Sequence, residues 1–540
     1  MNTKPNYTII PNYDPASLWI SHFQRAAANN ADGATYVSLL EQMIDAHADA
    51  EIDWLVHSVF EGFRTPYTSC ENADPYSFGD HPILRGHSWI YPVLDAIDAE
   101  GRSLIQVLLD RCQKKDVKFL VGLRMNDRHA GSGQNALFWP RVQRMLDEHP
   151  EWALTEFPGG LDYRYEGVRQ AVLAFVAETL ERFDVDGLEF DWMRWCHMFP
   201  ASEAVSSAPL LTEFTRKVRE MLDQASSARG RTDNQRLVLG ARVPHTLEQC
   251  IYLGYDIEAW LKDGLVDYLA PSDFFFMDYN MPTEDFVSLA DEAGSRCRIY
   301  PSLHPGCCWD NNLHNTAANY RAAAKNFYAQ GAHGVSPYNY QSHWGLTHRG
   351  GVEVSEDIRN ADHRSIADFE EPLNHLTQLR RDDTIASGDR HYCYYPLWWD
   401  GASEGHAASG AYENDRLFLD CRDADPQGSY AFTITEDLSD PNLTATLAFI
   451  ATQMIEADQL QIHVNGHAID PNQIEREWFV GRARSEGRPL GRHFIYRMPL
   501  TAPSVQSGEN ELAVRLSHLG GMPSRVINVQ DFEIYVHVGP

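Results

Sequence analysis

The sequence predicts an α/β fold in which a (β/α)8 TIM barrel is followed by an antiparallel β-sandwich. Two patterns along the 540 residues predict this fold class. Over about the first 350 residues, short β-branched apolar runs alternate with long amphipathic stretches, which is typical of α/β proteins. After about residue 385, apolar and polar residues alternate strictly, which is typical of antiparallel strands with one buried face. We therefore predict a barrel domain over residues 1–384 and an all-β domain over 385–540.

Eight apolar runs are the candidate barrel strands. They cover residues 8–13, 54–60, 118–125, 187–191, 237–243, 268–272, 298–302 and 334–338. The stretches between them have the apolar spacing of helices, most clearly at 168–182 and 317–329. Eight strands that alternate with helices predict a closed barrel.

The C-terminal part shows apolar residues at every second position. This pattern is clearest at 460–464, 512–516 and 532–538. The run Val464-Asn465-Gly466 predicts a hairpin turn, because Asn and Gly tolerate the positive φ angles of a two-residue turn. Several strands of this kind predict a sandwich of two antiparallel sheets.

The composition limits the partners and the compartment. The chain has 76 acidic and 45 basic residues, a formal net charge of −31, which argues against nucleic acid as a partner. It has no apolar run of about 18 residues and no charged leader before an apolar segment, so we expect neither a membrane span nor a signal peptide. Nine cysteines without regular spacing favour reduced thiols and a cytoplasmic location. A secreted or periplasmic protein whose leader had been removed would show the same start.

The segment 186–194 changes from apolar to charged within a few residues. On a strand, Glu189 and Asp191 point to the same side, roughly 6–7 Å apart along the chain. Leu188, Phe190 and Trp192 then face the helical layer, so the two carboxylates face the barrel interior. Inward residues at the carboxyl ends of barrel strands line active sites. The alternative is that these acids form structural ion pairs with inward arginines.

Four segments resemble the barrels of the family 10-like glycoside hydrolases. The central ones are YRYEGVR at 163–169 and FDVDGLEFDWMR at 183–194, and GLRMND at 122–127 and DGLVDYLAP at 263–271 fit the same pattern. The resemblance covers about residues 1–350. It implies a (β/α)8 fold and the cleavage of glycosidic bonds, without a particular sugar.

Two other barrel types share features of the central strand. It resembles the D-G-x-D-x-D-x-E strand of family 18 chitinases, but Met193 stands where that family has its proton-donating Glu. Chitinase-type hydrolysis is therefore not predicted. In barrels of the α-galactosidase type, the fourth strand ends in a nucleophilic Asp and the acid follows the sixth strand. By analogy, Asp191 and Asp273 hold these two positions.

Glycosidic cleavage requires one carboxylic acid to protonate the leaving oxygen and one carboxylate to act at the anomeric carbon. We predict Asp191 as the nucleophile or base, and Asp273 or Glu189 as the acid. Asp127 is a further candidate. For Asp273 the alternative is a residue that caps a turn.

Basic and aromatic side chains gather at the predicted strand mouths. The predicted substrate contacts are Arg124, Asp127, Arg194, Arg242, His245, His304, Tyr338 and Trp344. We expect the substrate to be a poly- or oligosaccharide. Because arginine binds carboxylate and sulfate groups, a sulfated or uronate-bearing substrate fits these arginines. No metal-binding or phosphate-binding motif is present, so we expect no metal and no cofactor.

Two other functions fit the same residues. A polysaccharide lyase would use a His or Tyr base and a cation that neutralises a uronate, and Tyr338, His245 and Arg124 have these chemistries. A glycan-binding barrel without catalysis is the other alternative, because Met193 removes one known proton donor. The C-terminal part resembles the jelly-roll sandwiches appended to many glycosidases, where it either binds sugar or only packs against the barrel.

Overall fold

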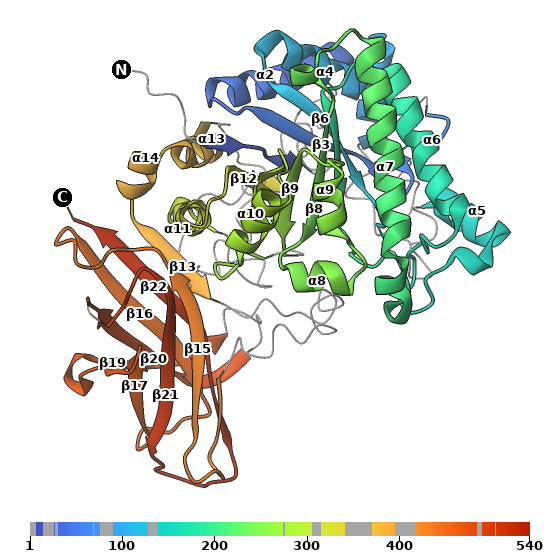
Figure 1. Cartoon of the computed structure of the whole chain (residues 1–540). Helices are drawn as coiled ribbons and strands as arrows, with labels where there is room; N and C mark the ends of the chain where they lie inside the picture. Colours follow the sequence, from blue (N-terminus) through green and yellow to red (C-terminus); the bar gives the residue numbers. More distant parts are fainter. Residues whose placement is uncertain are drawn as a thin grey trace.

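The computed structural model of the chain (Figure 1) describes residues 7–13, 26, 31–67, 70–75, 90–127, 139–273, 276–304, 315–340, 370–394, 417–482, 489–502 and 504–539. Every structural statement below concerns these residues.

Parallel strands occupy all eight regions in which the sequence predicts them. They are β1 (Thr8–Ile9), β2 (Asn12–Tyr13), β3 (Trp54–Glu61), β6 (Lys118–Arg124), β7 (Gly187–Asp191), β8 (Val238–Pro244), β9 (Tyr268–Ser272), β10 (Arg298–Ile299), β11 (Ser302–Leu303) and β12 (Gly334–Pro337). Two short strands, β4 (Arg64–Thr65) and β5 (Asp74–Pro75), follow β3. The central strands β7, β8 and β9 are buried along their whole length, as expected for parallel strands with both faces covered.

Two of the predicted strands, 8–13 and 298–302, are each divided into two short strands. Pro11 and Pro301 lie at the two breaks, and proline has no N–H to donate to a neighbouring strand. At each break the chain changes partner: the carbonyl of Pro11 accepts from Val56, and that of Pro301 accepts from Ser336. The prediction of continuous strands at these two places was wrong for this reason.

The strand pairs connect in a regular order. β3, β6, β7, β8, β9 and β10 pair successively in parallel. β11 pairs with β12, β12 with β1, and β2 with β3. Since β10 and β11 share one chain segment, and β1 and β2 share another, the order of neighbours returns to the segment at which it began.

Helices separate these strands along the chain and surround them in Figure 1. They are α2 (Gly33–Asp49), α3 (Ile90–Ala99), α4 (Leu104–Lys115), α5 (Pro140–Glu148), α6 (Glu166–Arg182), α7 (Ala204–Ala228), α8 (Leu247–Tyr252), α9 (Ile257–Lys262), α10 (Thr283–Glu292), α11 (Ala317–Ala329), α13 (Glu370–Thr377) and α14 (Asp382–Ala386). Both helices that the sequence predicts most clearly are confirmed. α6 begins two residues before the predicted position, and α11 has the predicted bounds, which a capping box between Thr316 and Asn319 sets at its start.

One residue before each of β3, β7, β9 and β12 repeats the same side-chain contact. We call Asp53, Asp186, Asp267 and His333 the base residues. Each accepts the N–H of the second residue of the preceding strand in the parallel order. The donors are Ile9, Phe119, Leu239 and Ile299, at 3.2, 3.0, 2.8 and 3.1 Å.

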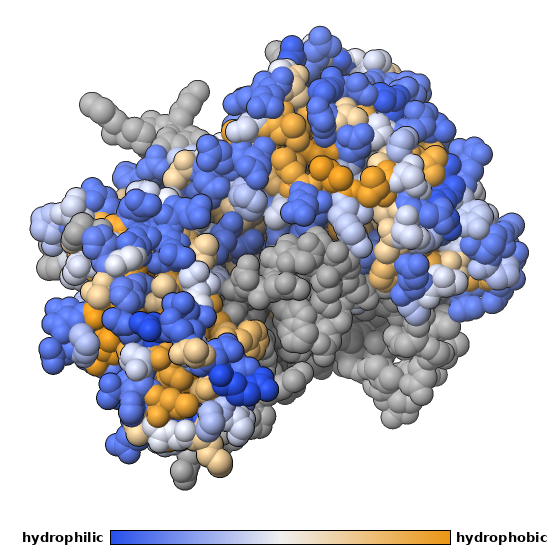
Figure 2. Space-filling view, turned by 60° about the horizontal axis from the view of Figure 1, so that its bottom comes forward, coloured by the Kyte–Doolittle hydropathy of each residue, from blue (hydrophilic) through white to orange (hydrophobic). Residues whose placement is uncertain are grey.

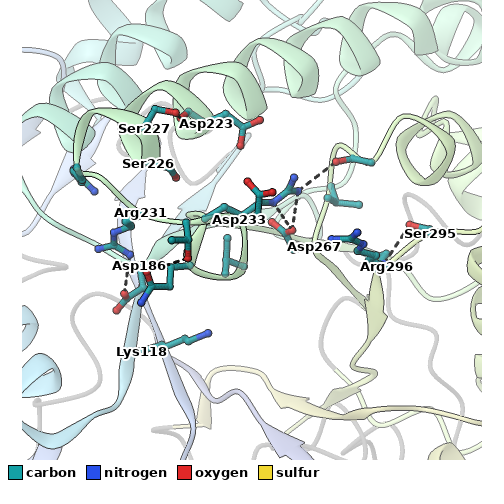
Figure 3. A pocket seen from close by; sticks show the side chains of 18 of the residues that line it. Lys118, Asp186, Asp223, Ser226, Ser227, Arg231, Asp233, Asp267, Ser295 and Arg296 are labelled. Carbon is teal, nitrogen blue, oxygen red and sulfur yellow. Dashed lines mark hydrogen bonds and ion pairs between the residues drawn. The ribbon is translucent and has the colours of Figure 1, made fainter.

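The backbone of the base residues repeats a second contact. Their carbonyls accept the N–H of the first residue of the following strand. The donors are Lys118, Val238, Arg298 and Thr8, at 3.1, 2.9, 3.0 and 3.2 Å. Arginines hold three of the base residues by ion pairs, as Figure 3 shows for Arg231 and Asp186. Each base residue therefore joins two neighbouring strands at their amino ends.

The C-terminal part forms two antiparallel sheets. One has the order β13-β22-β16-β20-β19, with β14 also paired to β22, and the other has the order β15-β21-β17-β18. Their bounds are β13 (Arg390–Tyr394), β14 (Leu417–Asp420), β15 (Gln427–Ile434), β16 (Leu443–Thr452), β17 (Gln459–Val464), β18 (His467–Ala468), β19 (Glu475–Arg482), β20 (Pro489–Leu500), β21 (Gly508–His518) and β22 (Val526–Val538). Tyr430 of β15 stacks on Phe532 of β22, so the sheets meet through apolar faces. The predicted hairpin turn is confirmed, because Asn465 and Gly466 both have positive φ angles.

The coloured surface in Figure 2 is mostly hydrophilic, with hydrophobic patches on both parts of the molecule. Among the residues that the structure describes, no helix combines the length and the apolar character needed to cross a membrane.

Asp267 provides the clearest test of the base residues. It accepts the Leu239 N–H and pairs with Arg219 and Arg236 at 3.1 and 2.8 Å. We expect Asp267→Ala to lower the free energy of unfolding by about 2–3 kcal/mol, because buried donors lose their acceptor. Urea unfolding followed by circular dichroism measures this. The control is Asp110→Ala, which removes an exposed ion pair to Arg102. Equal effects of the two variants would contradict the role of the base residues.

Two buried histidines make stability depend on pH. Burial lowers the pKa of His47 to about 4 and that of His304 to about 3. Nδ1 of His47 lies 2.7 Å from the carbonyl of Met43 and donates to it, so Nε2 accepts from the Tyr13 hydroxyl at 2.5 Å. An unfolded histidine titrates near about 6.5, so below that pH the unfolded chain binds more protons than the folded chain. The contribution of each histidine to the free energy of unfolding is therefore fully present above about pH 6.5 and is lost as the pH falls toward the folded pKa.

We expect the free energy of unfolding to fall by about 2 kcal/mol for each of these histidines between about pH 7 and about pH 5. Urea unfolding at a series of pH values checks this. In His47→Gln, which cannot gain the proton, the decrease should be smaller by that amount. An unchanged pH dependence in the variant would show that His47 does not titrate as described.

Candidate active site

Polar side chains from six neighbouring strands meet at the carboxyl ends of those strands. They are Arg124 on β6, Asp191 on β7, Arg242 on β8, Asp273 after β9, His304 after β11 and Tyr338 after β12. Each is at most 1% exposed. The sequence predicts all six as site residues, and the contacts described next connect them.

Asp191 ends β7, and both of its carboxylate oxygens are engaged. Oδ1 accepts the backbone N–H groups of Met193 and Arg194, at 3.1 and 3.0 Å. Oδ2 accepts the Tyr338 hydroxyl at 2.9 Å and lies 4.0 Å from Nε of Arg124. Burial, together with the Asp191 charge, raises the pKa of Tyr338, so this hydroxyl stays protonated and donates. The carboxylate is therefore held in one orientation among groups that stabilise negative charge.

Asp273 shares a histidine with a second carboxylate. Nδ1 of His245, which follows β8, lies 3.9 Å from Oδ2 of Asp273 and 3.7 Å from Oδ2 of Asp278. Oδ1 of Asp273 accepts the N–H of Phe276 at 2.9 Å. Asp273 thus caps a turn with one oxygen, as the alternative interpretation expects, and presents the other oxygen to His245.

Glu189 lies two residues before the end of β7 and is fully buried. Oε1 accepts from Asn12 at 2.7 Å and lies 3.5 Å from Nη2 of Arg242. Oε2 accepts the Tyr268 hydroxyl at 2.7 Å. Tyr268 can reach it because Gly240 leaves space: a Cβ at Gly240 would lie 2.0 Å from Cζ of Tyr268. These contacts are those of the structural ion pair that the sequence leaves open as an alternative.

Two of the three predicted arginines are bound to protein groups. Arg124 donates to Glu61 and, at 3.1 Å, to Asn339. Arg242 donates to Ser302 and, at 2.7 Å, to Ser336, and its guanidinium lies 4.7 Å from the centre of the Tyr338 ring. Both arginines therefore position strand ends and carboxylates.

Arg194 lies in a different environment from these two arginines. It is partly exposed, its backbone N–H binds Asp191, and its guanidinium lies 5.9 Å from the Trp195 ring. Of the three predicted arginines, it is therefore the one that solvent reaches.

His304 lies between the Asp273 and Tyr338 sides of the cluster. Nε2 lies 3.1 Å from the Ser272 hydroxyl, which itself donates to the carbonyl of Asp273 at 2.7 Å. The ring packs edge-on against Tyr338, with centroids 5.6 Å apart. Since its pKa is lowered to about 3 by burial, His304 is neutral at physiological pH. Because the Ser272 hydroxyl donates to Asp273, Nε2 of the neutral imidazole donates to Ser272, and Nδ1 can act only as an acceptor.

The remaining predicted residues are Asp127 and Trp344. Asp127 is 2% exposed, and its Oδ2 lies 3.9 Å from Nη1 of Arg124, so it belongs to the same cluster. Trp344 lies outside the described residues.

Three residues of the cluster were not predicted from the sequence, namely Ser272, Asp278 and Asn339. Asn339 directly follows Tyr338, and Asp278 comes six residues after the end of β9. Ser272 is the last residue of β9. The position of all three at or after the end of a parallel strand is the signal that could have identified them, because such positions face the same end of the sheet.

Within the described ranges, no group of three or more His, Cys, Asp or Glu side chains is arranged to hold a metal ion. A large open groove, of about 1150 Å³, lies at the opposite end of the strands. It contains two base residues, Asp186 and Asp267, and Figure 3 shows these carboxylates beside arginines. Because Asp186 and Asp267 pair with arginines and support the strand ends, we do not regard it as the active site.

No family model matches the chain, and no curated protein matches it in sequence. The resemblance to family 10-like glycoside hydrolases therefore stays a prediction.

Several solved structures are distantly similar to this chain. An α-L-fucosidase from Vibrio sp. strain EJY3 has 11% identity over 99% of this chain and 97% of its own, with a TM-score of 0.38. A maltogenic α-amylase, AmyB from Thermotoga neapolitana, has 12% identity over 95% and 99%, with a TM-score of 0.36. An α-L-fucosidase from Paenibacillus thiaminolyticus has 10% identity over 72% of this chain, which spans 51% of that enzyme, with a TM-score of 0.38. At TM-scores of this size, the likeness assigns neither a fold nor an activity.

The contacts of Glu189 generate a test that separates it from Asp191. We expect Glu189→Gln to lower the free energy of unfolding by about 3 kcal/mol, because the buried Arg242 loses its counter-charge. Asp191→Asn, the control, should change it by about 1 kcal/mol at most, since the amide oxygen still accepts the Met193 and Arg194 N–H groups and only the acceptor for the Tyr338 hydroxyl is lost. Urea unfolding of both variants measures this. A Glu189→Gln variant as stable as the wild type would show that the Glu189 charge is not structural.

Proposed function

We propose that the chain is a glycoside hydrolase with a (β/α)8 barrel over residues 1–384 and a β-sandwich over 385–540. The observation that carries the proposal is the pair Asp191 and Asp273 at the carboxyl ends of strands. Both are almost fully buried, and each has one oxygen fixed by backbone N–H groups. The return of the strand order to segment 8–13 supports the barrel.

The two carboxylates have different surroundings, which supports different roles. Asp191 lies near the Arg124 guanidinium and accepts from Tyr338, and both stabilise a carboxylate anion. We assign it as the nucleophile or base. Asp273 shares His245 with Asp278, so two carboxyl groups approach the same imidazole nitrogen. A shared partner favours keeping a proton in the cluster, and we assign Asp273 as the acid.

The substrate class follows from the groups that line the site. His304, Ser272 and Tyr338 are neutral groups, and the hydroxyl oxygens of Ser272 and Tyr338, which donate to protein groups, can still accept from the hydroxyls of an oligo- or polysaccharide. A preference for a sulfated or uronate-bearing sugar would depend on Arg194, because it is the predicted arginine that solvent reaches, whereas Arg124 and Arg242 are buried. A lyase has less support, because the Tyr338 hydroxyl donates to Asp191 and Arg124 is paired with Glu61.

We expect Asp191→Asn and Asp273→Asn each to reduce turnover by about 10³-fold, with folding retained, because each removes one partner of the acid–base pair. The assay measures new reducing ends from a panel of neutral, uronate-bearing and sulfated polysaccharides. Asp45→Asn, which alters an ion pair with Arg111 on the outside of α2, is the control. Products with ultraviolet-absorbing unsaturated ends would indicate a lyase instead. Undiminished turnover in either site variant would exclude that residue from catalysis.

For the anionic preference, we expect Arg194→Gln to raise KM for a sulfated or uronate-bearing substrate by about tenfold, the effect of losing one charge-assisted hydrogen bond. The KM for a neutral substrate should stay unchanged. An enzyme that hydrolyses only neutral polysaccharides would contradict the anionic preference and leave the hydrolase proposal intact.

A further inference from the structure

Residues 276–282, which follow Asp273, lie between the proposed active site and the C-terminal sheets. On one side, this segment carries Asp278, whose carboxylate lies 3.7 Å from Nδ1 of His245. Asp278 also accepts the N–H of Asn280 at 2.8 Å, so a direct hydrogen bond links the two residues. On the other side, the Asn280 side chain contacts β15.

The Asn280 amide pairs with β15 as a neighbouring strand would. Oδ1 accepts the Thr433 N–H at 2.8 Å, and Nδ2 donates to the Ala431 carbonyl at 3.1 Å and to the Tyr430 hydroxyl at 3.3 Å. β15 is an edge strand of its sheet, and edge strands present unpaired backbone groups. The barrel side chain therefore satisfies backbone groups of the C-terminal part.

The residue before Asn280 is held in the same way. The carbonyl of Tyr279 accepts from the buried Asn326 of α11 at 3.1 Å, and the same amide donates to the Thr433 carbonyl at 2.8 Å. The Tyr279 ring packs against Tyr392 and Tyr394 of β13, with centroids 5.9 and 5.8 Å apart. The segment thus contacts strands of both C-terminal sheets.

The surface that holds the segment is itself rigidly attached to α11. The carboxylate of Glu436 is 1% exposed and pairs with Arg390 and with Lys325 of α11, at 2.7 and 3.3 Å. Asn319, also on α11, donates to the His391 carbonyl at 2.8 Å. Buried charged and amide groups in fixed pairs favour one relative position of the two parts, because any other position leaves them unpaired.

From these contacts we infer that the C-terminal part is a working component of the proposed active site. The edge of β15, acting through Asn280, positions Asp278 and Asp273 beside His245. Asn280 is a positioning residue, since it does not itself lie at the carboxylates. The inference rests on the proposed function only in the claim that this positioning affects catalysis; the positioning itself is a separate property of the fold.

The test compares Asn280→Ala with the wild type in the full-length chain. Carboxylates are labelled with a water-soluble carbodiimide and an amine, and mass spectrometry measures the labelling rate at each Asp. In the wild type, Asp273 and Asp278 are 1% and 8% exposed and should react slowly. In the variant we expect both to react about tenfold faster, because the loss of three hydrogen bonds allows the segment to open locally. Asp191, which does not contact the segment, should keep its rate.

The same variant is assayed on whichever polysaccharide of the panel the wild type cleaves. We expect kcat to fall about tenfold or more with KM within about twofold, because a displaced acid impairs the chemical step more than binding. Asn280→Asp keeps the acceptor for Thr433 and loses both donors, so it should lie between the wild type and Asn280→Ala. Asn442→Ala, which alters an exposed asparagine of the C-terminal part, is the matched control and should change neither measurement.

Each outcome decides the inference. Unchanged labelling of Asp273 and Asp278 in Asn280→Ala would overturn it. So would faster labelling with unchanged kcat in an active enzyme. If the wild type cleaves no polysaccharide, the proposed function fails, and the labelling rates alone still decide whether β15 positions the two carboxylates.

Discussion

The hydrogen bonds of the four base residues determine how every parallel strand lies relative to its neighbours. Each base residue uses its side chain for the preceding strand and its carbonyl for the following one, so a shift of one strand would break contacts on both sides. A shift by one residue would also turn inward side chains outward. The position of every side chain at the carboxyl ends of the strands therefore depends on contacts at the amino ends. Asp53, Asp186 and Asp267 fill this role as carboxylates with arginine partners, and His333 fills it as an imidazole.

This register places polar side chains at two successive levels along the strands. The two levels differ in their hydrogen-bond partners. In the inner layer, Glu189 is surrounded by Asn12, Tyr268 and Arg242, which compensate its charge and leave it no access to solvent. In the outer layer, Asp191 accepts from backbone N–H groups and from Tyr338. The same strand thus carries one carboxylate that holds the interior together and one that is oriented toward the mouth. Their alternation with Phe190 and Trp192, which pack among the helices, follows from the two-residue period of a strand.

The contact between the two parts of the chain includes several amide side chains and buried charges beside the packing of Tyr279 on β13. Asn280, Asn319 and Asn326 bind backbone groups of the edge strands β13 and β15, and Lys325 pairs with Glu436. Such contacts are directional, unlike apolar packing, and therefore select one orientation. They also protect the two sheet edges that face the N-terminal part. Through these contacts, the C-terminal part holds residues 276–282, the segment after β9, in position.

The sequence by itself determined the eight strand regions, helices α6 and α11, the hairpin at Asn465, and six of the buried polar residues at the strand ends. These depend on local patterns: apolar periodicity, turn residues and polar residues that follow a strand. Only the tertiary structure decided that Glu189 pairs with Asn12 and Arg242, that Arg124 and Arg242 are bound to protein groups, and that Asp278 joins Asp273 at His245. It alone brought Asn280 to β15. Most of these contacts join residues far apart in the chain, such as Asn12 and Glu189 or Asn280 and Thr433. A pattern of neighbouring residues does not predict contacts across such separations.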